Sequence, residues 1–126
     1  MSIKKQNIII FFSLFFTFAI NTTLIASEIV KNDLLIIFKR TMLKWNINYD
    51  NLKENKAGAV CVPKNIDKIF IEKGWFSAIG YSYNMASKEY AIKTALTGCE
   101  QMYKKNNLDK KCKCIPIIYN NISNLD

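Results

Sequence analysis

The chain has 126 residues, of which 50% are apolar, 13% are aromatic and 22% are charged, and its formal net charge is +8. This balance is typical of a folded chain, so it excludes a wholly disordered protein and favours a single domain. The sequence contains no histidine, which excludes nucleophilic sites built on a Ser/His or Cys/His pair and most catalytic zinc sites.

The first 27 residues have the pattern of a secretory signal peptide. Lys4 and Lys5 form a basic start, Ile8–Ile20 is almost wholly apolar, and residues 21–27 lead to two small residues. The apolar run is shorter than the roughly 20 residues that span a membrane. We therefore expect cleavage after residue 26 or 27 and an exported protein, periplasmic or extracellular. If the segment stayed attached, the protein would be anchored to the membrane.

Residues 28–45 predict an amphipathic helix. Its apolar side chains recur at helical spacing on one face: Leu34, Ile37, Phe38, Met42 and Trp45. The basic side chains lie mostly off that stripe: Lys31, Lys39, Arg40 and Lys44. Two interpretations stay open, since the apolar stripe could pack on the core of the domain or the helix could contact a membrane surface or a partner. Residues 46–56 are polar and rich in Asn, which indicates a linker.

From residue 57 the pattern changes to short strands, expected at residues 57–62, 68–71 and 75–82. Pro63 ends the first of them because it cannot continue a central ladder. Between the second and the third, residues 72–74 predict a hairpin connection with Gly74 at positive φ. In the third strand Phe76, Ala78 and Gly80 share one face, whose small residues would let a helix approach closely.

A long helix and a last strand follow. Ser87 as N-cap and Glu89 in the first turn predict a helix from residue 87 to about 106. One stripe of this helix is apolar: Ile92, Ala95, Leu96, Cys99, Met102 and Tyr103. The last strand is expected at Cys112–Tyr119, with Cys112 and Cys114 on one face. Because strand, helix and strand form a crossover unit, the strands on either side of the helix should run parallel.

These elements predict an α+β fold. It would be a small mixed β-sheet of about four strands, with one main helix packed on one face, an N-terminal amphipathic helix and disulfide cross-links. Three segments follow from the pattern: a signal peptide at 1–27, an amphipathic helix and linker at 28–56, and a disulfide-tied strand–helix–strand domain at 57–126.

Residues 75–119 also resemble a known family. Near the third strand the resemblance is carried by Trp75, Ala78, Tyr81 and Ser82, and in the helix by Ala91, Ala95, Leu96 and Cys99. A cysteine then opens an isoleucine-rich strand. The pattern is similar to that of a family of small exported bacterial domains of unknown function, so the resemblance implies no catalytic residue. The chain departs from the family in carrying Cys61 upstream and in having no cysteine after the last strand.

Four cysteines in an exported chain predict two disulfides. A Cys112–Cys114 bond would close a strained small ring, so Cys99 should bond one of the two and Cys61 the other. The rise per residue in a helix and in a strand places Cys99 level with Cys114, which favours Cys99–Cys114 and Cys61–Cys112. The family resemblance instead favours Cys112 as the partner of Cys99. Other interpretations are a redox-active Cys112/Cys114 pair and a four-thiolate zinc site.

The leading functional hypothesis is an exported, non-catalytic binding module of the cell envelope, of the inhibitor or immunity type, without a cofactor or metal. Its partner would be another exported protein or an anionic envelope component, and export argues against nucleic acid. The basic residues of the 28–45 helix are the expected interaction surface. The first alternative is a thiol-redox or metal-binding periplasmic protein. The second is a small hydrolase that uses carboxylates, such as Asp67 with Glu72 or Glu89 with Glu100.

Overall fold

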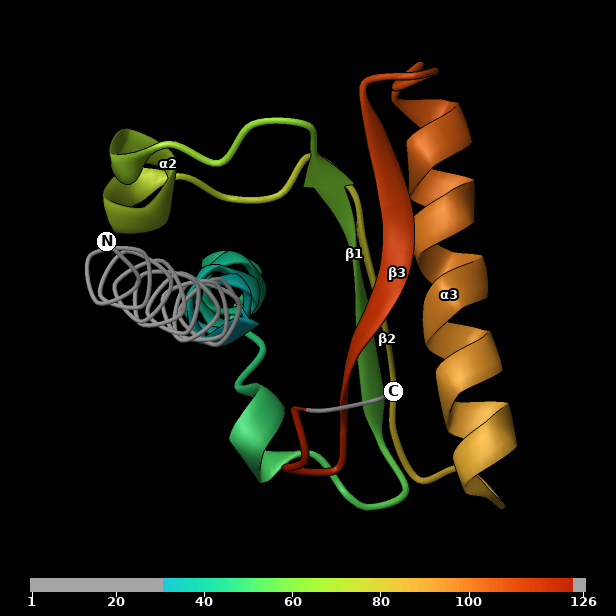
Figure 1. Cartoon of the computed structure of the whole chain (residues 1–126). Helices are drawn as coiled ribbons and strands as arrows, with labels where there is room; N and C mark the ends of the chain where they lie inside the picture. The colour runs from blue at the N-terminus through green and yellow to red at the C-terminus, as the bar shows by residue number, and fades with distance from the viewer. Residues whose placement is uncertain (1–30, 124–126) are drawn as a thin grey trace, which may run out of the picture. The chain divides into compact units, whose positions relative to one another are not determined.

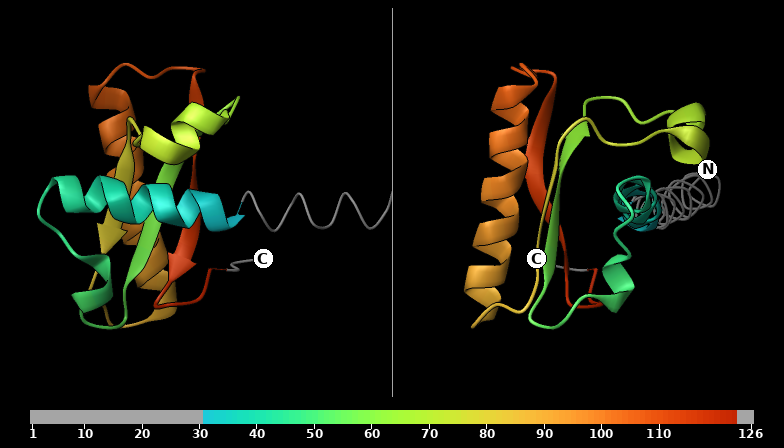
Figure 2. Two further views of the ribbon diagram at one scale, coloured as in Figure 1. Left: turned by 90° about the vertical axis from the view of Figure 1, so that its left-hand side faces the viewer. Right: turned by 180° about the vertical axis from the view of Figure 1, so that it is seen from behind.

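The computed structural model describes residues 31–123, and Lys31–Asp126 make one compact unit. The expected signal peptide and residues 28–30 of the expected first helix lie outside the described residues. A three-stranded sheet forms the middle layer of the unit. Helix α3 (Lys88–Lys105) covers one face, and on the opposite side lie the helix of residues 31–44 and the short helices η1 (Tyr49–Asn51) and α2 (Lys68–Lys73) (Figures 1 and 2).

Strand β1 (Ala57–Pro63) is the central strand of the sheet, between β2 (Ile79–Ser82) and β3 (Cys112–Tyr119). It is antiparallel to both neighbours. The expectation of a mixed sheet of about four strands is therefore wrong for the described residues, where the sheet has three strands and both pairings are antiparallel. The strands that flank α3 do run in the same direction, but β1 lies between them and takes their hydrogen bonds.

The residues expected as a second strand form helix α2 instead. Asp67 is its N-cap, and the Asp67 carboxylate accepts the Phe70 N–H at 2.7 Å, which satisfies an amide that would otherwise be unpaired. Gly74 follows the last turn with φ −76°, so the expected hairpin with Gly74 at positive φ is also wrong. A run as short as residues 69–71 fits a helix or a strand equally well, and here the capping residues decide.

The strand expected at residues 75–82 is shorter and begins at Ile79. Upstream of it the Phe76 N–H donates to the Thr41 hydroxyl at 3.2 Å, so at Phe76 the chain is bound to the 31–44 helix. Phe76 is buried on that side of the sheet. The expectation that it faces α3 together with Ala78 and Gly80 is therefore wrong for Phe76.

The interface between α3 and the sheet is built from small residues. Helix α3 begins after its N-cap Ser87 and ends at Asn106, and its fully buried residues are Ala91, Ala95 and Cys99. The expected stripe residues Ile92, Leu96, Met102 and Tyr103 surround these and are half-buried. A Cβ added to Gly80 would collide with the backbone of Ala95 and Cys99. The helix axis therefore lies very close to β2.

The opposite face of the sheet has a core of large side chains: Leu34, Ile37, Phe38, Met42, Tyr49, Val60, Phe76, Ile79, Ile117 and Ile118. Four of them come from the 31–44 helix, which runs across the strands (Figure 2). Trp45, expected on the same stripe, lies beyond the helix and is 43% exposed. Since one core joins the 31–44 helix to the strands, the expected division at residues 56 and 57 does not separate two bodies.

Candidate functional site

Two disulfides anchor β3, one between Cys61 and Cys112 and one between Cys99 and Cys114. They are the pairs that the rise-per-residue argument favours. In the register of β1 and β3, Cys61 lies opposite Cys114, yet Cys114 bonds to α3 and Cys61 bonds diagonally to Cys112. No cysteine is free, so a redox or zinc role would first require these bonds to be reduced. Two disulfides fit an oxidising compartment.

Arg40, one of the four expected interaction residues, caps the C-terminal end of α2. Its guanidinium donates at distances of 2.8 to 3.3 Å to the backbone carbonyls of Phe70, Ile71, Glu72 and Gly74. The last carbonyls of a helix have no partner within the helix and carry partial negative charge, which a cation there stabilises. Arg40 therefore fixes α2 to the 31–44 helix.

The other three expected interaction residues lie in different surroundings. Lys39 forms an ion pair with Asp50 at 2.9 Å, and both side chains are largely exposed, so the pair contributes little to stability. The Lys44 ammonium lies 3.2 Å from the ring centroid of Trp75, as a cation–π contact. Lys31 is exposed at the start of the described helix. Lys39, Arg40 and Lys44 thus use their charges within the protein.

Replacing Arg40 by Lys should lower the free energy of unfolding by about 1.5 kcal/mol, because one ammonium cannot reach four carbonyls and charged hydrogen bonds contribute about this much. Guanidinium unfolding measures the change, and limited proteolysis at residues 68–74 should show a loosened α2. Lys73→Arg, an exposed change in the last turn of α2, is the control and should change neither. Equal unfolding midpoints for Arg40→Lys and wild type would contradict the capping role.

The carboxylates proposed for a hydrolase are not brought together. Asp67 and Glu72 lie at opposite ends of α2, where Asp67 is the N-cap and Glu72 lies 4.0 Å from Lys68. Glu89 and Glu100 are both exposed on α3, and their separation along the helix is roughly 16 Å at about 1.5 Å per residue. Glu89 and Glu100 are therefore too far apart to act on one substrate group, and the Asp67 carboxylate already accepts the Phe70 N–H.

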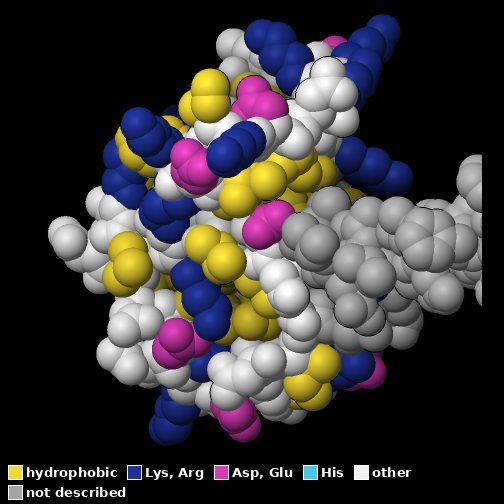
Figure 3. Space-filling model, turned by 60° about the vertical axis from the view of Figure 1, so that its left-hand side comes forward, with side chains coloured by type: hydrophobic (Ala, Val, Ile, Leu, Met, Phe, Trp, Pro, Cys, Tyr) yellow, Lys and Arg dark blue, Asp and Glu magenta, His cyan; other side chains and the backbone are white. Residues whose placement is uncertain are grey.

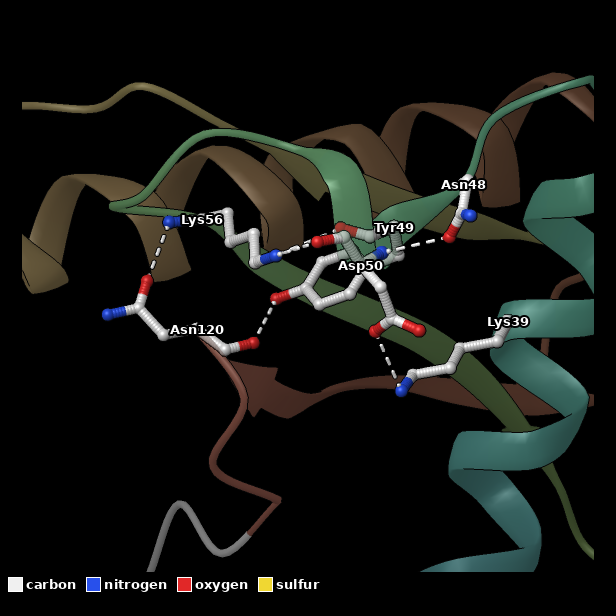
Figure 4. A network of polar contacts seen from close by, with 6 residues as sticks. All are labelled: Lys39, Asn48, Tyr49, Asp50, Lys56 and Asn120. Carbon is white, nitrogen blue, oxygen red and sulfur yellow. Dashed lines mark hydrogen bonds and ion pairs between the residues drawn. The ribbon is translucent and has the colours of Figure 1, made fainter.

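Figure 4 shows a polar network that holds residues 48–56 against the end of β3. Lys56 is 2% exposed, and its ammonium donates to the Tyr49 carbonyl at 3.0 Å and the Asp50 carbonyl at 3.2 Å. The backbone of Lys56 exchanges two hydrogen bonds with Asn120, at 3.1 and 2.7 Å. The expected linker is therefore a fixed part of the fold. Sequence reasoning missed it because Asn120 lies 64 residues from Lys56.

Tyr49 completes this network. Its hydroxyl donates to the Asn120 carbonyl at 2.9 Å, and its side chain is 1% exposed. Burial raises the pKa of Tyr49, and the neighbouring Asp50 carboxylate adds to the rise. The hydroxyl therefore stays protonated and keeps its donor role, which is structural.

The face that carries the 31–44 helix and α2 shows hydrophobic side chains among Lys and Arg side chains (Figure 3). The large hydrophobic residues of this region that are exposed are Ile36, Leu43, Trp45, Ile69 and Trp75. It is the surface on which the expected membrane or partner contact of the first helix would fall.

Strand β2 is an edge strand whose outer side is partly open. The Cys61 N–H donates to the Ala78 carbonyl at 2.9 Å, and in an antiparallel register the backbone groups of Ile79 and Tyr81 then point away from β1. The side chain of Met102 covers this edge at Ile79, because its sulfur accepts the Ile79 N–H at 3.4 Å. The N–H and C=O of Tyr81 are left facing outward.

A shallow groove of about 450 Å³ runs beside this open edge. We call it the β2-edge groove, and its lining residues are Tyr81, Tyr90, Lys93, Thr94, Thr97, Gly98 and Gln101. All but Tyr81 come from α3 and recur at helical spacing, so the helix flank forms one wall and the β2 edge forms the other. None of the groove residues of α3 belongs to the apolar stripe that the sequence predicts for this helix.

The other edge of the sheet differs from β2. Strand β3 carries Lys113 and Pro116, and its pairing with β1 has a register shift between Gly58 and Ala59. Lysine, proline and bulges are features that prevent an edge from pairing with another strand. Strand β2 has the sequence Ile-Gly-Tyr-Ser and carries neither Lys nor Pro. The β2 edge is thus the one that remains able to accept a further strand.

Comparisons with protein-family models, with curated proteins and with solved structures find no match. Within residues 31–123 no helix is both long enough and apolar enough to cross a membrane. In the same part of the chain no group of three or more His, Cys, Asp or Glu side chains could hold a metal ion.

Proposed function

We propose that the protein is an exported, non-catalytic binding module that takes an extended segment of a partner protein as an additional strand beside β2. The β2-edge groove carries this proposal, since it combines an unpaired strand edge with a helix flank at a distance that leaves about 450 Å³ between them. Domains that bind peptides by strand addition use this arrangement.

The groove provides both parts of such a site. The outward N–H and C=O of Tyr81 offer main-chain hydrogen bonds, which supply affinity without regard to sequence. The wall of α3 offers Thr94, Thr97 and Gln101 as polar contacts and Tyr90, 61% exposed, as an aromatic contact. Lys93 is the one charged residue of the lining, so an acidic side chain in the partner segment would be favoured.

Export and the envelope location rest on three observations. The first 27 residues have the pattern of a signal peptide. The two disulfides fit an oxidising compartment. The resemblance of residues 75–119 to small exported bacterial domains points the same way. Binding to a segment of another exported protein would suit an inhibitor- or immunity-type role.

Site-specific photo-crosslinking tests the proposal in the cell that makes the protein. A photoreactive residue at Thr97, in the groove, should give an adduct with one partner chain, and the cross-linked residues of that partner should lie in a single extended segment. The same residue at Glu72, exposed on α2, is the control and should give no such adduct. Purified partner should slow hydrogen exchange of the Tyr81 amide.

A steric variant makes the test independent of cross-linking chemistry. Thr97→Trp fills the groove at an exposed position and should abolish binding of that partner. Lys104→Trp adds the same bulk at an exposed position of α3 outside the groove and should leave binding intact. Equal binding by the two variants, or a partner that leaves the Tyr81 amide unprotected, would refute strand addition at β2.

A further inference from the structure

A second groove, of about 390 Å³, lies at the end of the sheet where β1 stops and β3 starts. We call it the lysine groove, and its lining residues are Val62, Lys64, Lys110, Cys112 and Lys113. Three of these five residues are lysines and none is acidic. The groove therefore concentrates positive charge in a small concave space.

The fold fixes the position of each lysine through the backbone. The register of β1 and β3 puts Lys113 opposite Val62 and Cys112 opposite Pro63, with Lys64 next along the chain. The Cys61–Cys112 disulfide cross-links the two strands at this end.

Lys110 comes from the loop after α3, where its N–H donates to the Tyr103 hydroxyl at 3.0 Å. Its φ is 63°, a left-handed conformation that lysine adopts rarely. The Tyr103 hydroxyl in turn donates to the Asp109 carboxylate at 3.2 Å. The backbone thus holds three lysines around the lysine groove.

Within residues 31–123, no ion pair includes a lysine of the lysine groove. The ion pairs among these residues are Lys39–Asp50 and Lys68–Glu72. Residues 104–113 contain five lysines and a single carboxylate, Asp109. Like charges held close together repel one another and raise the free energy of the folded state. A bound polyanion would remove that repulsion.

We infer that the lysine groove binds a soluble polymer that carries closely spaced phosphate groups. Lysine attracts phosphate as a point charge, and three ammonium groups in one groove can meet consecutive phosphates of a linear chain. The one arginine of the chain, Arg40, is occupied by the end of α2, so no bidentate fork selects a particular geometry.

The lining residues also argue against two other polyanions, an anionic membrane surface and single-stranded nucleic acid. The exposed large hydrophobic residues of the described chain all lie outside the groove: Ile36, Leu43, Trp45, Ile69, Trp75, Tyr83, Tyr90 and Ile122. Amphipathic membrane-surface sites combine basic residues with such side chains, which enter the headgroup region. Single-stranded nucleic acid is bound largely by stacking of its bases on aromatic rings, and none lines this groove. The proposal does not depend on strand addition at β2.

Binding of long-chain inorganic polyphosphate to the oxidised full-length protein, measured by fluorescence anisotropy over a series of salt concentrations, tests the inference. The triple variant Lys64→Gln, Lys110→Gln, Lys113→Gln should bind on the order of 100-fold more weakly, at about fivefold for each lysine. The slope of log affinity against log salt should fall by about 2 to 3. The matched control, Lys53→Gln, Lys68→Gln, Lys73→Gln, removes the same charge elsewhere and should keep most of the affinity.

Circular dichroism melting establishes that both triple variants fold. An equal loss of affinity in the two variants would show a response to net charge alone and would overturn the inference. No binding of polyphosphate by the wild-type protein at physiological salt would do the same. Binding to vesicles that contain phosphatidylglycerol, without binding to polyphosphate, would assign the groove to a membrane surface and also overturn it.

Discussion

Reduction of the two disulfides is expected to remove most of the stability of the domain. In the chain-entropy estimate the Cys99–Cys114 bond, with a sequence separation of 15, contributes about 3 kcal/mol, and the Cys61–Cys112 bond, with a separation of 51, contributes about 4 kcal/mol. The two closed loops overlap, so the sum is an upper bound. It is still comparable with the roughly 5 to 15 kcal/mol of a typical domain. Guanidinium unfolding with and without reductant measures the loss.

Paired substitutions divide this effect between the two bonds. Cys61→Ala with Cys112→Ala opens the longer loop and should lower the unfolding free energy by about 1 kcal/mol more than Cys99→Ala with Cys114→Ala. Cys61 and Cys99 are both buried, at 2% and 0% exposure, so the packing losses are similar and largely cancel in the comparison. A reduced protein that unfolds at the same denaturant concentration as the oxidised one would contradict the stabilising role of both bonds.

Gly80→Ala is expected to lower the unfolding free energy by at least about 3 kcal/mol, the upper end of overpacking penalties. The added methyl group would collide with the carbonyl of Ala95 and the amide of Cys99. Both are backbone groups of α3, which cannot turn aside as a side chain can. The helix would have to move away from β2 and would strain the Cys99–Cys114 link. Thermal melting of the oxidised variant measures the effect.

Gly98→Ala is the matched control, since it adds the same methyl group on the other side of the same contact. The added Cβ would lie 3.3 Å from the Gly80 Cα, which is tight but within reach of a small adjustment. Alanine is also favoured over glycine inside a helix by about 1 kcal/mol. The two effects oppose each other, so stability should stay within about 1 kcal/mol of wild type. An equal loss of stability in the two variants would contradict the close approach of Gly80 to the backbone of α3.

Local signals explain which elements could be predicted from the sequence. Helix α3 combines a capping serine, an acidic first turn and a sustained apolar period, and its observed ends are those expected. The small residues Ala78 and Gly80 did indicate the face on which a helix approaches. The run at residues 69–71 was misread because it is too short to show a period. Asp67 before it and Gly74 after it were the signals for a helix.

The two grooves could not be predicted because they depend on pairings between distant residues. The residues near Tyr81 in the sequence do not indicate that β2 is an edge strand. That position follows from the pairing of β1 with β3, in which Ala57 lies opposite Tyr119. The same pairing brings Lys64 beside Lys113. The Lys56 network likewise joins residues that are 64 positions apart. Periodicity and capping describe a segment alone, and these features belong to the way segments meet.

Both disulfides end on β3, the last strand of the chain. A chain that emerges into an oxidising compartment from its N-terminus therefore presents Cys61 and Cys99 before either native partner is available. During that interval an oxidant can join these two thiols only to each other. Where that bond has formed, the thiolate of Cys112 attacks Cys61, or that of Cys114 attacks Cys99, and the other early thiol is released. A second two-electron oxidation by the oxidant of the compartment then closes the remaining native bond. A chain that has formed the early bond thus needs exchange as well as oxidation, and the yield of correctly paired protein should depend on an isomerase.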